Sequence, residues 1–95
     1  MAATVVVDIE VLEPVEYEEY KLLAAPTVGA YGGRYVARGG AVEVLEGDWF
    51  PNRLVILEFP TVAQAQAWWA SPEYSVAKAI RQRTARTNMV LVAGM

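Results

Sequence analysis

The side chains that could do chemistry in this sequence are arginines and carboxylates spaced along short β-branched segments. Arg34 and Arg38 alternate in one segment, and Asp8 and Glu58 lie in two others. Residues an even number apart share one face of a strand, so these four side chains could meet on neighbouring strands if the register allows. Such a cluster could bind an anionic or enol-like ligand, with a desolvated Glu58 or Asp8 of raised pKa as the base and an arginine stabilising the oxyanion.

The same four residues also have a purely structural interpretation. Charged groups at the centre of a sheet are costly to desolvate and must be paired. An ion-pair network that fixes the register of a dimer would pair them without any ligand. The two interpretations differ in the role of Arg38. It binds a ligand if the cluster is a binding site, and it stabilises the dimer if the cluster is structural.

A turn-rich segment, GDWFPN at Gly47–Asn52, supplies a second candidate site. Its Trp49 could form a stacking wall for a ligand, and Arg53, which follows the segment, could clamp an anion. The alternative is that Trp49 caps the core as a lid while Arg53 forms a salt bridge with Asp48 or Glu46. Both interpretations stay open.

Tyrosine hydroxyls are further candidates, because the chain contains no histidine. Tyr74 and Tyr31 could donate hydrogen bonds or act as acids in a ligand-binding cavity. Tyr74 also falls at helical spacing beside Trp68 and Ala77, which is typical of a core residue with its hydroxyl at the rim. Adjacent helical residues point about 100° apart, so at least one of Trp68 and Trp69 should reach a subunit interface or line the cleft.

Composition excludes many kinds of site. The 95 residues include no cysteine and no histidine, which removes disulfides, thiolate nucleophiles, zinc–thiolate sites, iron–sulfur clusters, the usual haem ligand and the usual general base. A carboxylate-only site is the metal option left, and we expect no cofactor. The pairs Gly32-Gly33 and Gly39-Gly40 lack the spacing of phosphate-binding loops, so we interpret them as turns.

The charge pattern argues against nucleic-acid and membrane partners. The net charge is −3, and neither a membrane span of about 20 apolar residues nor a signal peptide is indicated. We therefore expect a cytoplasmic protein. Acidic residues dominate the start of the chain and basic residues gather near its end, at Lys78, Arg81, Arg83 and Arg86. We interpret these clusters as solvated helix faces, with complementary subunit contacts as the alternative.

Hydrophobic periodicity and turn residues predict an alternation of strands and helices. The expected elements are a strand at Thr4–Val11, a helix from Pro14 that Pro26 should kink or interrupt near Leu22–Ala25, strands at Arg34–Arg38, Val42–Leu45 and Arg53–Phe59, helices at Val62–Ala70 and from Pro72, and a last strand at Asn88–Ala93. This order predicts an α+β fold of the ferredoxin-like split βαβ kind, an antiparallel sheet with helices on one face. No linker or repeat divides the chain, so we expect residues 1–95 to form a single domain.

Composition also predicts a homodimer. Hydrophobic residues make up 55% of the chain. A chain of this length buries only about 60–65% of the surface that its unfolded form exposes, so its own core is modest. Some of the apolar side chains should therefore be buried between subunits. The sheet face away from the helices would expose Val6, Val36, Leu54 and Val90, which is too apolar to be left in water. Two such sheets packed face to face would cover it.

Several spaced motifs together resemble a known bacterial family. They are Tyr31-Gly32-Gly33-Arg34, Arg38-Gly39-Gly40, Leu45-Glu46-Gly47-Asp48-Trp49, Pro51, Arg53, Glu58-Phe59-Pro60 and Ser71-Pro72-Glu73-Tyr74. Over nearly the whole chain the sequence is similar to the family of domains of unknown function numbered 1330, in the dimeric α+β barrel superfamily. The resemblance implies a homodimer whose two sheets form a barrel around a cavity, in a superfamily that includes cofactor-free monooxygenases, lactone isomerases and haem-binding enzymes. Haem ligation by the usual histidine is excluded by composition.

The leading functional prediction is a homodimer that binds a small anionic or aromatic metabolite in a cavity between sheet and helices, through Arg34, Arg38 and Arg53. A cofactor-free enzyme of the monooxygenase or isomerase type is the sharper form of this prediction. The alternative is a noncatalytic dimerisation or interaction module whose charged cluster is structural. The residues leave the substrate and the reaction open.

Overall fold

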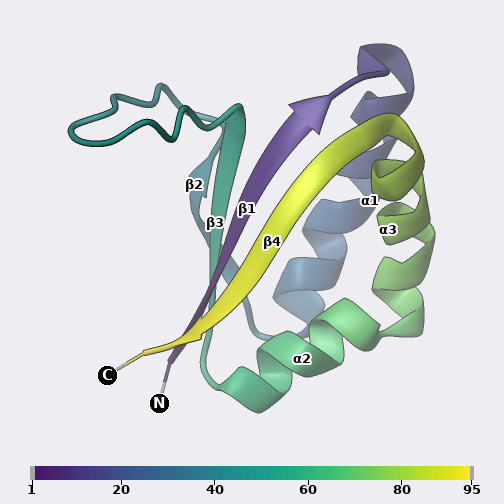
Figure 1. Ribbon diagram of the computed structural model, residues 1–95. Coiled ribbons are helices and arrows are strands. Elements are labelled where there is room, and N and C mark those ends of the chain that lie inside the picture. The colour runs from purple at the N-terminus through teal and green to yellow at the C-terminus, as the bar shows by residue number, and fades with distance from the viewer. Residues whose placement is uncertain (1, 95) are drawn as a thin grey trace.

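One antiparallel sheet with three helices on one face organises the chain. The computed structural model describes residues 2–94. In order, its elements are β1 (Ala3–Val11), α1 (Pro14–Ala30), β2 (Arg34–Arg38), β3 (Arg53–Phe59), α2 (Val62–Ala70), α3 (Pro72–Thr84) and β4 (Ala85–Ala93). The strands lie in the order β2-β3-β1-β4, and the helices cover one side of the sheet (Figure 1). This is the ferredoxin-like α+β fold that the sequence predicts.

The central strand β1 shows why the sheet has one buried and one open face. Val5, Val7 and Ile9 are buried against the helices, while Val6 and Asp8 point to the other side and are only half-buried. The strand pairs with β3 along one edge and with β4 along the other. The predicted alternation in this strand is confirmed, and we call the side without helices the outer face.

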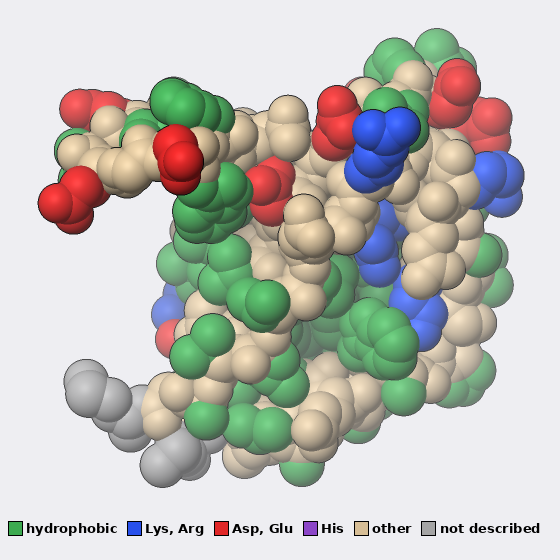
Figure 2. Space-filling view, in the orientation of Figure 1, with side chains coloured by type: hydrophobic (Ala, Val, Ile, Leu, Met, Phe, Trp, Pro, Cys, Tyr) green, Lys and Arg blue, Asp and Glu red, His purple; other side chains and the backbone are tan. Residues whose placement is uncertain are grey.

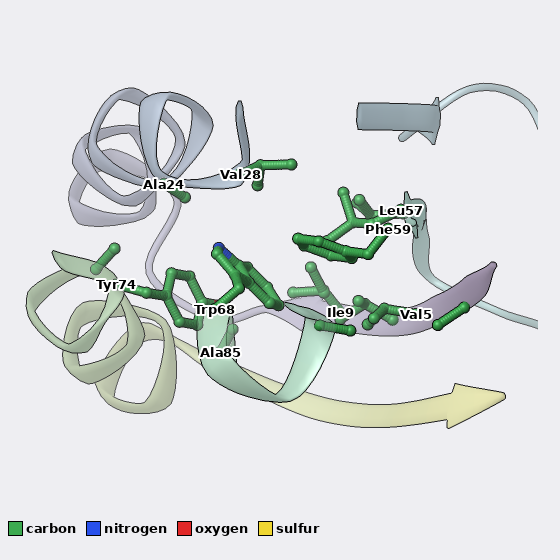
Figure 3. Packing of buried hydrophobic residues seen from close by; sticks show 14 of the residues in the cluster. Val5, Ile9, Ala24, Val28, Leu57, Phe59, Trp68, Tyr74 and Ala85 are labelled. Atoms are coloured by element: carbon green, nitrogen blue, oxygen red, sulfur yellow. The ribbon is translucent and has the colours of Figure 1, made fainter. Parts of the chain in front are cut away.

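Trp68 on α2 joins four elements in the core (Figure 3). Its ring centroid lies 4.2 Å from that of Tyr74 on α3 and 5.4 Å from that of Phe59 on β3. Its Nε1 donates a hydrogen bond to Thr27 Oγ1 on α1, with an N–O distance of 3.0 Å. Trp68 is 1% exposed, so this hydrogen bond satisfies an indole N–H that would otherwise be costly to bury.

Hydroxyl caps set where the last two helices begin. Thr61 Oγ1 accepts a hydrogen bond from the Gln64 N–H at the start of α2. Ser71 Oγ accepts one from the Tyr74 N–H at the start of α3, and Pro72 occupies the first turn. These are the N-cap positions that such residues favour, and the predicted restart of the helix at Ser71-Pro72 is confirmed.

The expected interruption at Pro26 is wrong, because α1 runs without a break from Pro14 to Ala30. A proline inside a helix removes one backbone hydrogen bond to the residue four positions earlier. Here Pro26 and Leu22 are both exposed. The affected turn therefore lies on the solvent side of α1, where water can hydrate the carbonyl oxygen that loses its donor.

One predicted strand is absent, and the start of another differs from the prediction. Val42–Leu45 is not a strand, because within residues 2–94 the segment finds no partner strand; the whole of residues 40–52 is an irregular loop that projects from the sheet (Figures 1 and 2). The last strand begins at Ala85, three residues before the expected Asn88, since Ala85 pairs with Val11 at the far end of β1. We call residues 40–52 the β2–β3 loop.

The returning end of the β2–β3 loop is attached to the outer face through Asp8. Trp49 Nε1 donates a hydrogen bond to Asp8 Oδ2 at 3.0 Å, and the Asn52 N–H donates one to Oδ1 at 2.9 Å. The Trp49 hydrogen bond, supported by the one from Asn52, lowers the pKa of Asp8 below its ordinary value of 3.8. Asp8 is thus held as a carboxylate that fixes the root of the loop.

We predict opposite effects on stability for alanine at two neighbouring glycines. A Cβ at Gly33 would lie 2.5 to 2.9 Å from the ring of Phe59, whereas one at Gly29 in α1 meets nothing within 4 Å. Gly33→Ala should therefore destabilise the protein by about 1–3 kcal/mol, and Gly29→Ala should stabilise it by up to about 1 kcal/mol. Urea denaturation of both variants checks this; equal changes in the midpoint would contradict the packing at Phe59.

We also predict that the contact between Asp8 and Trp49 survives to unusually low pH. Because the pKa of Asp8 is lowered on folding, its contribution to stability is complete above 3.8 and is lost as the pH falls through the lower folded-state value. The indole N–H resonance of Trp49, followed by NMR in an acid titration, should shift with a midpoint below 3.8. Asp8→Asn should remove the titration, and a wild-type midpoint at or above 3.8 would refute the assignment.

Candidate functional site

Two of the four predicted cluster residues form a pair on the outer face. Arg34 lies directly opposite Glu58 in the register of β2 and β3. The Arg34 Nη2 and Nε atoms both donate to Glu58 Oε1, at 2.8 and 3.1 Å. Both side chains remain well exposed, so the pair contributes little to stability by itself.

A β-bulge separates Arg38 from that pair. Tyr35 is opposite Leu57, but Ala37 is opposite Ile56, so Val36 is an extra residue in β2. An extra residue reverses the alternation of the strand beyond it. The expectation that Arg34 and Arg38 share a face is therefore wrong, because Arg38 lies opposite Val55 and on the side of the helices.

The two predicted carboxylates are also apart. Asp8 is opposite Leu54 in the sheet, whereas Glu58 is opposite Thr4, four positions along β1. The expected raised pKa of a buried base is wrong for Asp8, whose pKa is lowered by its hydrogen bonds. Asp8 and Glu58 therefore take part in two separate polar contacts on the outer face, and the four predicted residues do not form one cluster.

The structure contradicts the structural alternative for the loop residues and leaves their predicted ligand-binding roles as predictions. Trp49 is 58% exposed and hydrogen-bonded to Asp8, so it does not cap the core. Within residues 2–94 Arg53 forms no salt bridge with Asp48 or Glu46. Instead Arg53 lies on the helix side, with its guanidinium 6.0 Å from the ring centre of Tyr17.

Arg81 on α3 is the functional candidate that sequence reasoning missed. Of the basic residues near the end of the chain, Arg83 pairs with Glu16 and Arg86 with Glu10, at exposed positions. Arg83 thus lies on a solvated helix face of this chain, as predicted, whereas Arg86 lies on strand β4 and not on a helix. Arg81 is only 4% exposed, because it falls on the buried stripe of α3.

The Arg81 side chain is mostly buried, but its unused guanidinium donors are not among the buried atoms without a partner, so they keep some contact with solvent. Its Nε donates to the Tyr74 hydroxyl oxygen at 3.3 Å, and within residues 2–94 it forms no salt bridge. A guanidinium has five N–H donors and is always charged. Buried arginines are normally paired with carboxylates, so Arg81 is available to an anion from outside the chain.

Arg81 lines a cavity of about 590 Å³ between α2, α3 and the edge strand β4, which we call the β4 cavity. Figure 2 shows this face of the molecule hollowed beside β4, with basic and hydrophobic side chains along the hollow. The walls are mainly apolar, from residues that include Val5, Trp68, Trp69, Met89 and Leu91. Thr87, another lining residue, has a buried Oγ1 without a hydrogen-bond partner within residues 2–94.

The tryptophan pair divides between core and cavity rim. Trp68 is 1% exposed and Trp69 is 46% exposed, because adjacent residues on a helix diverge. Both rings line the β4 cavity, as predicted for at least one of them. Lys78 covers the open side of Trp69, with its Nζ 3.7 Å from the ring centre.

A chain of hydroxyls leads from Arg81 into the core. Tyr74 is fully buried, and its hydroxyl oxygen lies 2.9 Å from that of Tyr20 on α1. Burial, followed by the neighbouring Tyr74, raises the pKa of Tyr20. Tyr20 therefore stays neutral at ordinary pH, and the Tyr74 hydroxyl beside it accepts the hydrogen bond that Arg81 donates.

The signal for Arg81 was present in the sequence pattern. Tyr74, Ala77, Arg81 and Thr84 recur at three- and four-residue spacing, and all four are buried. A charged residue in such a stripe is rare unless paired. Arg81 was instead grouped with the other basic residues near the end of the chain, and its buried position was therefore overlooked.

Two negative findings concern the residues that the structure describes. Across residues 2–94 no group of three or more acidic side chains is arranged to hold a metal ion. In the same part of the chain, no helix has the length and hydrophobicity needed to cross a membrane.

Solved structures share this fold at low sequence identity. A protein of unknown function from Rhodopseudomonas palustris, RPA0582, is 19% identical with a TM-score of 0.78, covering 99% of this chain and 82% of that one. A dimeric ferredoxin-like protein of unknown function from Jannaschia sp. CCS1 is 14% identical with a TM-score of 0.74, covering 99% and 100%. SnoaB from Streptomyces nogalater, a cofactor-independent oxygenase, is 13% identical with a TM-score of 0.68, covering 99% and 93%.

Sequence comparison identifies the family. A search of curated proteins found no match. The family model DUF1330, a domain of unknown function, matches residues 2–95. Since the match spans almost the whole sequence, the chain belongs to the DUF1330 family.

Proposed function

We propose that the protein is a homodimer that binds a small anionic aromatic metabolite in the β4 cavity, with Arg81 as its anion-binding group. The observation that carries this proposal is the largely buried side chain of Arg81, which has one hydrogen bond and, within residues 2–94, no salt bridge. It moves the anion-binding role from Arg34, which is occupied by Glu58, to a residue that the chain leaves without a carboxylate.

The energetic argument rests on desolvation. Burying an ion costs several kcal/mol, about the stabilisation that its paired carboxylate would return. One hydrogen bond of 3.3 Å to Tyr74 returns only part of that cost for Arg81. A residue kept at such a position lowers the stability of the free protein, and an anionic ligand in the cavity would restore the missing interaction.

The cavity walls favour a flat, largely apolar ligand. Its volume of about 590 Å³ is within the roughly 300–1,000 Å³ typical of small-molecule sites. Trp69, which is 46% exposed, offers an aromatic surface, while Arg81 and the Thr87 hydroxyl supply the few polar groups that would orient a ligand. A carboxylate, phenolate or enolate on an aromatic ring matches both requirements.

A cofactor-free enzyme is the sharper form of the proposal. A guanidinium that stabilises a bound phenolate or enolate lowers the pKa of that ligand. A lower pKa favours deprotonation of the ligand, which is the first step of cofactor-free oxygenase or isomerase chemistry. The fold is shared with SnoaB, a cofactor-independent oxygenase, but similarity of fold carries no reaction with it. In this proposal Arg81 stabilises the oxyanion, and Asp8 and Glu58 serve the architecture of the outer face.

The dimer follows from the outer face. Val36, Val90 and Val92 are each more than half exposed there, and Val6 and Ile56 lie paired at its centre. A single chain leaves this apolar area in water, and a second copy packed sheet to sheet would cover it. The Jannaschia protein that shares this fold is described as dimeric. The alternative is a noncatalytic dimerisation or interaction module, in which the protein forms the same dimer but binds no ligand.

We predict that Arg81→Met abolishes the preference for an anionic ligand and raises thermal stability. The probes are 2-naphthoate and its neutral analogue 2-naphthamide, titrated against tryptophan fluorescence. The wild type should bind the carboxylate at least about tenfold more tightly, as a charged hydrogen bond implies, and the variant should bind both equally. The melting temperature of the free variant should rise by about 4 °C or more, since a buried unpaired charge is replaced by an apolar side chain.

Arg83→Met is the matched control, because Arg83 lies on the same helix at an exposed position paired with Glu16. It should leave the preference for naphthoate unchanged. Equal binding of the two probes by the wild type would refute the anion site. A lower melting temperature for Arg81→Met with an unchanged preference would make Arg81 a structural residue and favour the noncatalytic alternative.

We predict that Ile56→Glu converts the dimer into a folded monomer. Ile56 lies on the outer face, so its replacement would bury a charge at the proposed sheet-to-sheet contact. Val76→Glu is the control, since Val76 is 61% exposed on α3 and away from that face. Light scattering gives the mass of each variant, and circular dichroism checks the fold. A wild type that is monomeric, or an Ile56→Glu variant that stays dimeric, would contradict the proposed interface.

A further inference from the structure

A second hollow lies at the sheet edge opposite the β4 cavity, between α1 and the ends of β2 and β3. It has a volume of about 460 Å³, and its lining includes Lys21, Arg38 and Arg53. The same three basic residues border a smaller cavity of about 20 Å³, which has room for roughly one water-sized atom. We call the hollow and this small cavity together the α1 cleft.

Three features of the backbone bring its two arginines together. The bulge at Val36 turns Arg38 to the helix side, where its Nη2 donates to the carbonyl oxygen of Lys21 at 3.3 Å. Gly39 follows with a φ of +71°, a conformation that glycine adopts without strain. A Cβ at Gly39 would overlap the guanidinium of Arg53, so the glycine also provides the space that Arg53 occupies.

The charges in the α1 cleft do not balance. Glu18, its carboxylate, is already paired with Lys21 at 2.8 Å. Within residues 2–94 neither arginine forms a salt bridge. The Nε of Arg53 is buried without a hydrogen-bond partner in the same part of the chain. Two guanidinium groups therefore face one cleft with unused donors.

Aromatic rings hold the guanidinium groups in place. Arg38 lies over the ring of Tyr35 at 4.5 Å, and Arg53 lies near that of Tyr17 at 6.0 Å. Cation–π contacts fix a guanidinium but satisfy none of its N–H donors. Donors that these contacts leave unused, among them the Arg53 Nε, remain for an acceptor that enters the cleft.

We propose that the α1 cleft binds a phosphate group, either as the free ion or carried by a small metabolite. The planar fork of arginine matches phosphate oxygens two at a time, and two forks beside a lysine favour a doubly charged oxyanion. The small inner cavity admits a single oxygen atom, while the open part of the cleft leaves room for a substituent. Neither Arg38 nor Arg53 lines the β4 cavity, so this proposal does not depend on the proposed function.

The test is calorimetric titration of the purified protein with inorganic phosphate and, separately, with ethyl phosphate, at fixed ionic strength set with sodium chloride. The wild type should bind one phosphate group per chain. Arg38→Gln and Arg53→Gln should each weaken binding by about tenfold or more. Arg34→Gln is the matched control, because Arg34 lies on the same strand but on the outer face, and it should bind like the wild type.

Further arms keep the result separate from the other proposals. Arg81→Met should bind phosphate as tightly as the wild type. The phosphate proposal can therefore be tested even if no ligand binds in the β4 cavity. Gly39→Ala, which displaces the Arg53 guanidinium without changing any charge, should also weaken binding. Tighter binding of ethyl phosphate assigns the site to a metabolite, and tighter binding of inorganic phosphate assigns it to the free ion.

Absence of phosphate binding by the wild type would overturn the proposal. So would equal losses in Arg34→Gln and Arg38→Gln, which would indicate attraction by net charge alone. If light scattering shows that Arg38→Gln dissociates the dimer, the occupant is instead a second copy of the chain, whose β2–β3 loop carries Glu43, Glu46 and Asp48.

Discussion

The burial of Trp68 is the interaction on which the rest of the structure depends. Its ring packs against Tyr74 and Phe59, and its N–H reaches Thr27, so one side chain fixes α1, α2 and α3 over the sheet. The hydroxyl of Tyr74 then lies between Tyr20 and Arg81. Because α2 and α3 are held at this point, the space between them and β4 stays open as a cavity rather than closing into core.

The arginines show how position, not residue type, decides what a charge can do. Arg34 is opposite Glu58 and is neutralised at the surface. Arg38 and Arg53 face a cleft that lacks a free carboxylate, and Arg81 is buried beside a single hydroxyl. A guanidinium that already has a carboxylate partner gains less from an anionic ligand than one without such a partner, and the gain is larger for the buried Arg81 than for the exposed Arg38. The anion-binding potential of the molecule therefore lies on its helix side.

Much of the fold could be predicted from the sequence because its signals are local. Alternating valines predict β1, the hydroxyl and proline at Ser71-Pro72 predict the start of α3, and the order of elements predicts the ferredoxin-like sheet. The candidate site was predicted less well. Its proposed members were grouped by assuming an unbroken alternation, and the extra residue at Val36 reverses that alternation for Arg38.

The sequence by itself determined the family, most of the strands and helices, the lack of thiol and imidazole side chains, and the supply of arginines and aromatic rings. Tertiary structure alone decided which arginine is paired, which is exposed and which is buried. Helical spacing places Arg81 on a buried stripe, but only the packing of α2, α3 and β4 decides that most of its side chain is buried beside the β4 cavity and that no carboxylate within residues 2–94 pairs with it. Pairing and desolvation depend on residues distant in the chain, and no local pattern reports them.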